Sequence, residues 1–281
     1  MRIAIYYEYG KKREIGTGHK YRAEAIAKEL KKRGHKVELT TDDIVKSGWD
    51  VLIIDHIHNK KSIIDRAKSC NIRVILIDGV EENVKEVDLS ISAFYNTSAE
   101  NKGIKYIAFP VASEWNKHNL ETKNKCVFVS MGGFDANDYA ELVLDALDEL
   151  SINAIVTKSI NHSKDYNAYN RVRVFNETNY YDAMNECNIA ITNGGLTLFQ
   201  SLSYGLPTIA IPQYEHQKWN IDGVKEYCLS AEPNKEDIKE KITTLMNDDY
   251  MRRRFSIWSM MQVDGKGVER ICDLIEQGEL K

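Results

Sequence analysis

The apolar positions of this 281-residue chain form short runs that alternate with segments of helical spacing. In the first half the runs read RIAIYY, KVEL, DVLIID, RVILID and VDLSIS, and helical segments are expected near residues 20–33 and 60–70. Continuous apolar runs of this length are typical of parallel strands that are covered on both faces. The pattern therefore predicts an α/β domain built on a parallel sheet.

The alternation stops near Pro110 and then starts again. The segment PVASEWNKHNLETKNK is polar and aperiodic, which indicates a linker. After it, CVFVSMGG precedes the helical stretch DYAELVLDALDEL, and the runs NAIVTK, VRVFN, IAITN and PTIAIPQ each precede a further helical segment. From Lys235 onward the chain reads as helical. We therefore predict two α/β domains with a cleft between them, residues 1–120 and residues 121–281, the second including the helical tail.

Three glycine-rich turns follow strands and precede helices: GTGH at 16–19, SMGGFD at 130–135 and TNGGLT at 192–197. Glycine lets the backbone approach a ligand closely, and a helix N-terminus offers a phosphate unpaired amides and a partial positive charge. Any one such turn can also serve strand–helix packing alone. Together they predict a phosphorylated ligand across the cleft. The turn residues expected to bind it are Gly16, Gly18, Gly132, Gly133, Asn193, Gly194 and Gly195.

The first turn ends in His19, at the start of a helix and at the carboxyl end of the first strand. Because open α/β sheets bind ligands at that edge, His19 is the candidate catalytic residue, with helix capping or phosphate contact as the alternative. Arg22 lies one turn further along and either reaches a phosphate or is a solvated surface arginine. Asp55 and His56 end a strand that faces the same cleft, where they orient His19, contact the ligand or cap the next turn.

Four further polar side chains accompany the third turn. Gln200 lies on the helix that this turn opens, and His216, Gln217 and Asn220 follow the next strand, at the same edge of the sheet. On one interpretation they are plain surface side chains. On the other, Gln200 bonds ribose hydroxyls, and His216 and Gln217 lie near a diphosphate or a sugar.

Composition and motif content exclude several classes of function. A formal net charge of −4 argues against a nucleic-acid partner. No run approaches the ~20 apolar residues of a membrane span, and five scattered cysteines without a CxxC pair indicate a cytoplasmic protein with reduced thiols. The turns lack the Walker lysine and the GxGxxG fingerprint, and neither Asp-x-Asp nor zinc-type ligand spacing occurs. We expect neither a cofactor nor a bound metal.

The motifs GTGHKYR, IIDH at 53–56, SMGGFD, and a glycine turn leading to GLP and HQ together resemble the PseG/SpsG family. Its members are nucleotide-sugar hydrolases of pseudaminic acid biosynthesis, with glycosyltransferase-like relatives. The layout is similar to that of MurG-type glycosyltransferases. The resemblance therefore implies two Rossmann-like domains in a GT-B arrangement.

For function, the resemblance implies a metal-independent hydrolase that removes UDP from a 2,4-diacetamido-trideoxyhexose, with His19 as the general base. A histidine suits this task because water must lose a proton as it attacks the anomeric carbon. The chain departs from the family in the loop EYGKKRE before the first glycine turn, and in Gln200, where glutamate is usual. Two alternatives stay open: a GT-B glycosyltransferase that passes the sugar to an acceptor, and a non-catalytic nucleotide-sugar-binding protein.

Overall fold

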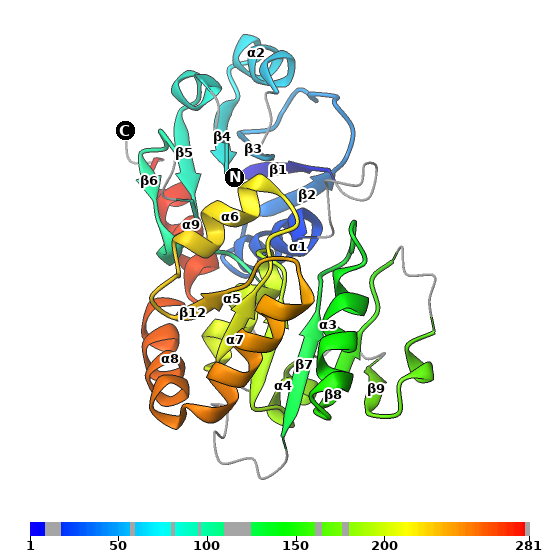
Figure 1. Cartoon of the computed structure of the whole chain (residues 1–281). Helices are drawn as coiled ribbons and strands as arrows, with labels where there is room; N and C mark the ends of the chain where they lie inside the picture. The colour runs from blue at the N-terminus through cyan, green and yellow to red at the C-terminus, as the bar shows by residue number, and fades with distance from the viewer. Residues whose placement is uncertain are drawn as a thin grey trace. The chain divides into compact units, whose positions relative to one another are not determined.

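A computed structural model of the chain describes residues 1–8, 18–56, 60–79, 82–94, 97–109, 125–160, 165–175 and 180–278. It divides into two compact units. Unit 1 consists of Met1–Pro110 and Gly265–Lys281, and unit 2 consists of Val111–Asp264. Within the described residues, each unit contains one six-stranded parallel sheet with helices packed on it (Figure 1).

Unit 1 has the strand order β2-β1-β3-β4-β5-β6. Its apolar runs alternate between the two faces of the sheet, because successive side chains of a strand point to opposite sides. One face packs on α1 and α9, and the other packs on α2. The strands are β1 (Arg2–Tyr7), β2 (Lys36–Thr40), β3 (Val51–Asp55), β4 (Arg73–Ile77), β5 (Leu89–Ser92) and β6 (Asn101–Lys102). The helices are α1 (Gly18–Lys32), α2 (Lys61–Ser69) and α9 (Gly267–Gln277), with short 3-10 turns at Glu82–Glu86 and Ile104–Tyr106.

The helix α9 belongs to unit 1, whereas the sequence pattern assigned the whole helical tail to the second domain. Arg33 Nη1 on the chain after α1 donates to Asp273 at 2.7 Å and to Glu276 at 2.9 Å, and the apolar face of α9 joins the core beside α1. A Cβ on Gly267 would lie 1.9 Å from the carbonyl oxygen of Ile107, so the helix starts against the backbone of unit 1. Periodicity predicted this helix but could not show which sheet it covers. The expected boundary at 120/121 lies outside the described residues.

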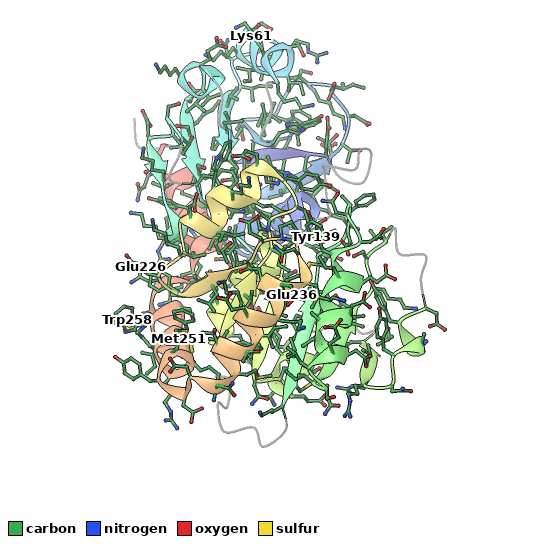
Figure 2. All side chains as sticks on the ribbon, viewed as in Figure 1. Lys61, Tyr139, Glu226, Glu236, Met251 and Trp258 are labelled. Carbon is green, nitrogen blue, oxygen red and sulfur yellow. The ribbon has the colours of Figure 1, made fainter. Side chains whose placement is uncertain are left out.

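Unit 2 has the strand order β12-β11-β10-β7-β8-β9. Its sheet packs on α3 and α7 on one face and on α4 and α5 on the other. On α8, Met251 packs against the core and Trp258 is exposed (Figure 2). The strands are β7 (Cys126–Ser130), β8 (Asn153–Thr157), β9 (Val172–Phe175), β10 (Ile189–Thr192), β11 (Thr208–Ala210) and β12 (Cys228–Ser230). The helices are α3 (Tyr139–Glu149), α4 (Tyr180–Asn185), α5 (Leu196–Tyr204), α6 (Glu215–Asp222), α7 (Lys235–Asn247) and α8 (Asp249–Gln262), with a 3-10 turn at Tyr166–Ala168.

Each sheet has a point at which the strand order reverses. In unit 1 this point lies between β1 and β3, and in unit 2 it lies between β7 and β10, so that the second sheet has the strand order of a dinucleotide-binding fold. Helices leave neighbouring strands toward opposite faces there, which opens a crevice at the carboxyl edge of the sheet. The two reversal points are therefore where each unit is expected to hold its functional residues.

Candidate functional site

The reversal point of unit 1 gathers charged side chains from one helix and two strands. Tyr7 at the end of β1 is the register partner of Asp55 at the end of β3, and α1 begins at Gly18. His19 and Arg22 are three residues apart, so they share one face of the first turn of α1. Gly16 lies outside the described residues. The sequence-predicted residues His19, Arg22, Asp55 and His56 are thus brought together.

His19 and Asp55 form a hydrogen-bonded pair. The Nδ1 atom of His19 lies 2.7 Å from Oδ1 of Asp55, whose side chain is fully buried. Burial alone would raise the pKa of the Asp55 carboxyl, but the charges of Arg22 and His19 outweigh it and lower that pKa well below its usual range. An ionised carboxylate only accepts hydrogen bonds. Arg22 Nη2 also lies 3.1 Å from Nδ1 and could donate to it in the other tautomer. We assign the proton to Nδ1 because the carboxylate is the closer partner, which leaves Nε2 as the imidazole nitrogen that can accept a proton.

Arg22 lies between two carboxylates. Its Nε donates to Asp55 Oδ2 at 2.8 Å, Nη2 donates to Asp55 Oδ1, and Nη1 donates to Asp78 Oδ2. Burial would lower the pKa of Arg22, but the charges of Asp55 and Asp78 raise it. The interpretation of Arg22 as a solvated surface residue is wrong, because its side chain is buried and both edges of the guanidinium are bound within unit 1.

Asp78 is a member of this cluster that the sequence analysis missed. It follows β4 directly with a left-handed backbone (φ 57°), and its Oδ1 accepts hydrogen bonds from Ser92 Oγ at 3.1 Å and from the Ala93 amide at 2.8 Å. A signal was present in the sequence. VLIID and VILID are consecutive buried runs that both end in aspartate, and neighbouring parallel strands end at one edge.

A second cluster surrounds Glu8, just after β1. Its Oε1 accepts hydrogen bonds from Tyr6 Oη and Lys60 Nζ, both at 2.5 Å, and its Oε2 lies 3.4 Å from Nε2 of His56. Burial would raise the pKa of Glu8, but the hydrogen bonds from Lys60 and Tyr6 lower it to about 2. The rings of His56 and His19 stack with their centroids 6.1 Å apart. His56 therefore connects the Glu8 cluster to His19.

In unit 2, the glycine turns after β7 and β10 contact each other closely. Gly132 has a left-handed backbone (φ 78°), and a Cβ there would lie 2.9 Å from Asn193 Nδ2. That Nδ2 donates to the Met131 carbonyl at 2.7 Å, and Asn193 Oδ1 accepts from the Gly195 amide at 3.0 Å. The Asn193 side chain thus joins the two turns.

The amides of α6 bind the same turn. Gln217 Oε1 accepts hydrogen bonds from the Gly194 amide at 3.3 Å and from the Gln213 amide at 2.9 Å, and Asn220 Nδ2 donates to the Gly194 carbonyl at 2.7 Å. A Cβ on Gly194 would lie 2.6 Å from the Gln217 carbonyl oxygen. Gln217 and Asn220 are therefore not plain surface amides, because they hold the backbone of the turn.

The two helices behind these turns differ at their N-termini. Asp135 is buried, and its carboxylate accepts the Tyr139 amide at 3.0 Å and the Ala140 amide at 2.8 Å, so it occupies the first amides of α3. Gly195, the N-cap of α5, has no side chain to do the same. The first backbone amides of a helix lack partners within the helix. The N-terminus of α5 therefore offers an anion more backbone N–H donors than the N-terminus of α3 does.

The remaining predicted residues lie around these turns. The Gly133 carbonyl accepts the Ile160 amide at 2.9 Å. Gln200 is partly exposed on α5, and the ring of His216 stacks on Tyr214 with centroids 5.6 Å apart. Among the described residues, no group of three or more His, Cys, Asp and Glu side chains could hold a metal ion, and no helix is long and apolar enough to cross a membrane.

Comparison with known proteins gives a family match for the second half of the chain. Residues 111–257 match the glycosyl transferases group 1 family, which is just over half of the 281 residues. An uncharacterized protein of Methanocaldococcus jannaschii is 24% identical over 315 aligned residues, which cover 83% of this chain. The alignment spans only 65% of that relative's length.

Solved structures of the same fold cover nearly the whole chain. MurG of Acinetobacter baumannii superposes with a TM-score of 0.70 and 16% identity, covering 99% of this chain and 100% of the other. A putative UDP-N-acetylglucosamine 2-epimerase of Listeria monocytogenes gives a TM-score of 0.69 and 10% identity, covering 99% and 96%. These likenesses confirm the predicted fold, two Rossmann-like parallel-sheet units of the GT-B class.

Proposed function

The chain belongs to the glycosyl transferases group 1 family, and we propose that it hydrolyses the anomeric C–O bond of a UDP-linked deoxy-acetamido sugar. Water is the acceptor, and UDP and free sugar are released. The observation that carries this proposal is the pair of His19 and buried Asp55 at the reversal point of unit 1, which leaves Nε2 as the proton acceptor. A base so placed can take the proton of an attacking water.

In the proposed reaction, the oxygen of water forms a bond to the anomeric carbon while the bond from that carbon to the diphosphate oxygen breaks. The electron pair of the broken bond leaves with UDP. The proton of the attacking water passes to Nε2 of His19, and the Asp55 carboxylate stabilises the imidazolium that forms. This assigns proton transfer to His19 and orientation to Asp55, and it requires no metal ion.

We assign nucleotide binding to unit 2. The first amides of α5, together with the turns at Gly132, Gly133, Gly194 and Gly195, would bind the diphosphate. Asn193, Gln217 and Asn220 would hold those turns in shape through the hydrogen bonds described above. Gln200 would bond the ribose, and His216 would lie near the diphosphate or the sugar. Gly18 and His56 would contact the sugar. The resemblance to PseG/SpsG proteins supports a cytoplasmic step of nonulosonic acid or surface polysaccharide biosynthesis.

A glycosyltransferase is the second candidate, and the family match favours it. A transferase would use the same base on an acceptor hydroxyl in place of water. A protein that only binds nucleotide sugars is the third candidate, and the His19–Asp55 pair argues against it, because binding alone needs no oriented base.

The test incubates the protein with a UDP-linked diacetamido-deoxy sugar in ¹⁸O-labelled water, without an acceptor. We expect UDP release, label on the anomeric carbon, and initial product of inverted configuration, because a single base implies one direct displacement. His19→Ala should lower kcat ~100-fold or more, whereas His35→Gln, a histidine bound to Glu276, should not. Release only after an acceptor is added would indicate the transferase. Label in UDP would disprove attack at carbon, and tight UDP binding without turnover would leave only the binding protein.

A further inference from the structure

We infer that Asp78 is a positioning residue for His19, acting through Arg22 and Asp55. The inference rests on the proposed function for its kinetic consequence. Its structural consequence, the tautomer of His19, can be measured whether or not that function is right.

A chain of contacts connects Asp78 to His19. Asp78 holds Nη1 of Arg22, which turns the Nε and Nη2 edge of the guanidinium toward Asp55. That edge binds both oxygens of the Asp55 carboxylate, and Oδ1 then meets His19 Nδ1 at 2.7 Å. A planar guanidinium presents its donors in a fixed fork, so a partner at one end of the fork fixes the direction of the other end.

A short contact within the cluster shows why Asp55 must stay in place. Arg22 Nη2 lies 3.1 Å from His19 Nδ1, although both nitrogens carry protons when Nδ1 donates to Asp55. The two donors can lie this close because they share the acceptor Oδ1 of Asp55. Arg22 Nη2 already lies in hydrogen-bond geometry with Nδ1, and it would donate there if Asp55 no longer held the proton on Nδ1. His19 would then carry its proton on Nε2 and could not act as a base there.

Asp78 is itself fixed independently of Arg22. Ser92 Oγ and the Ala93 amide both donate to its Oδ1, while Oδ2 is left for Arg22. Ser92 Oγ also accepts a hydrogen bond from the Phe94 amide at 3.1 Å. The end of β5 and the residues after it therefore hold this carboxylate through hydrogen bonds. The orientation of Arg22 is thus determined by residues at the ends of β4 and β5.

The charges of the cluster do not balance. Asp55, Asp78 and Arg22 are 0%, 2% and 6% exposed, so one guanidinium lies between two buried carboxylates. The neighbouring Glu8 and Lys60 are paired with each other, with Glu8 also 3.4 Å from His56. Asp78 therefore gives Arg22 a second charged partner in addition to Asp55.

The experiment compares two variants. Asp78→Asn removes the charge of the side chain at nearly constant shape, and Ser92→Ala keeps that charge but removes the hydrogen bond from Ser92 Oγ to Asp78. Asp50→Asn is the control, since Asp50 binds the Arg2 amide at 2.6 Å outside the cluster. The readouts are kcat and KM, thermal unfolding, and the ¹⁵N shifts of the His19 ring, assigned with His19→Gln. A purely structural role for Asp78 would lower the unfolding temperature without moving kcat of the folded enzyme or the tautomer.

We expect Asp78→Asn to lower kcat about 10- to 100-fold, as outer partners of an oriented histidine typically do, with KM changed less than about twofold. The Nδ1–H form of His19 should lose population. Ser92→Ala should show the same changes to a smaller extent, and it replaces Asp78→Asn if that variant does not fold. A wild-type tautomer in both variants would overturn the inference. If the wild-type enzyme shows no hydrolysis, the proposed function fails, and the tautomer still tests the positioning role.

Discussion

A single methyl group added at Gly194 should disrupt the turn after β10. A Cβ there would lie 2.6 Å from the carbonyl oxygen of Gln217 and 2.7 Å from its Cβ. The oxygen is a backbone atom and the Cβ is fixed to the backbone, so rotation of the Gln217 side chain cannot relieve the overlap. Either α6 or the turn has to move, and that movement weakens the hydrogen bonds of Gly194 with Gln217 and Asn220.

The cost of Gly194→Ala can be estimated from these contacts. Overpacking of a close-packed interior costs about 1–3 kcal/mol. The hydrogen bonds at 3.3 Å from the Gly194 amide and at 2.7 Å to its carbonyl contribute about 0.5–1.5 kcal/mol each. Because a shifted turn loses these bonds only in part, we expect a total loss of about 2–4 kcal/mol. For a unit of this size the unfolding temperature should fall by roughly 5–15 °C.

The matched control is Gly195→Ala in the same turn. The nearest neighbour of a Cβ at Gly195 is the side-chain oxygen of Asn193, at 3.0 Å, and the three nearest atoms all belong to that side chain, none to the backbone. We expect this variant to lose no more than about 1 kcal/mol. Differential scanning calorimetry measures both variants, and titration with UDP measures binding, which Gly194→Ala should weaken at least tenfold (about 1.4 kcal/mol). Equal stability of the two variants would refute the close contact between the turn and α6.

Three further predictions concern unit 1 and the reaction. Asp55→Asn should cost about 1–3 kcal/mol in urea unfolding, because the Nε and Nη2 atoms of buried Arg22 lose their charged acceptor while Asp78 still balances the guanidinium; a loss well below about 1 kcal/mol would show that the pair is not buried and ionised. Since the folded pKa of Asp55 lies below its unfolded value, its contribution is present above about pH 4 and is lost as the pH falls further. Wild-type stability should therefore fall more steeply in acid than that of Asp55→Asn, and parallel curves would contradict this. Turnover should survive EDTA, because the sequence lacks an Asp-x-Asp motif; loss of activity that manganese or magnesium restores would show a metal requirement.

Much of the fold could be predicted because both sheets are buried on both faces. The run RVILID became β4 at Arg73–Ile77, and the helix expected near 60–70 is α2 at Lys61–Ser69. The strand β6 was not predicted, since its two residues, Asn101 and Lys102, carry no apolar pattern. The sequence pattern assigned α9 to the wrong unit. An amphipathic pattern indicates that a helix packs on a sheet, but it does not indicate which sheet.

The candidate site also has features that the sequence could predict and features that it could not. His19 and Asp55 could be placed together because residues that end neighbouring parallel strands, or begin the next helix, meet at one edge. That Asp55 is fully buried and bound to Arg22, and that Glu8 pairs with Lys60, could not be predicted. Such pairings depend on which side chains share the limited space at the edge, and a single sequence does not record those distances.

The two reversal points differ in chemistry, and the difference supports the division of roles between the units. The cluster of unit 1 consists of carboxylates, a guanidinium and imidazoles, with a surplus of negative charge beside His19. Such a site suits proton transfer and disfavours a phosphate, because like charges repel strongly where water is excluded. The turns of unit 2 are held by the neutral amides of Asn193, Gln217 and Asn220. Neutral amides beside an uncapped helix N-terminus attract an anion without protonation chemistry. Under the proposed function, a diphosphate is therefore expected to bind unit 2, and His19 of unit 1 is expected to accept the proton of the attacking water.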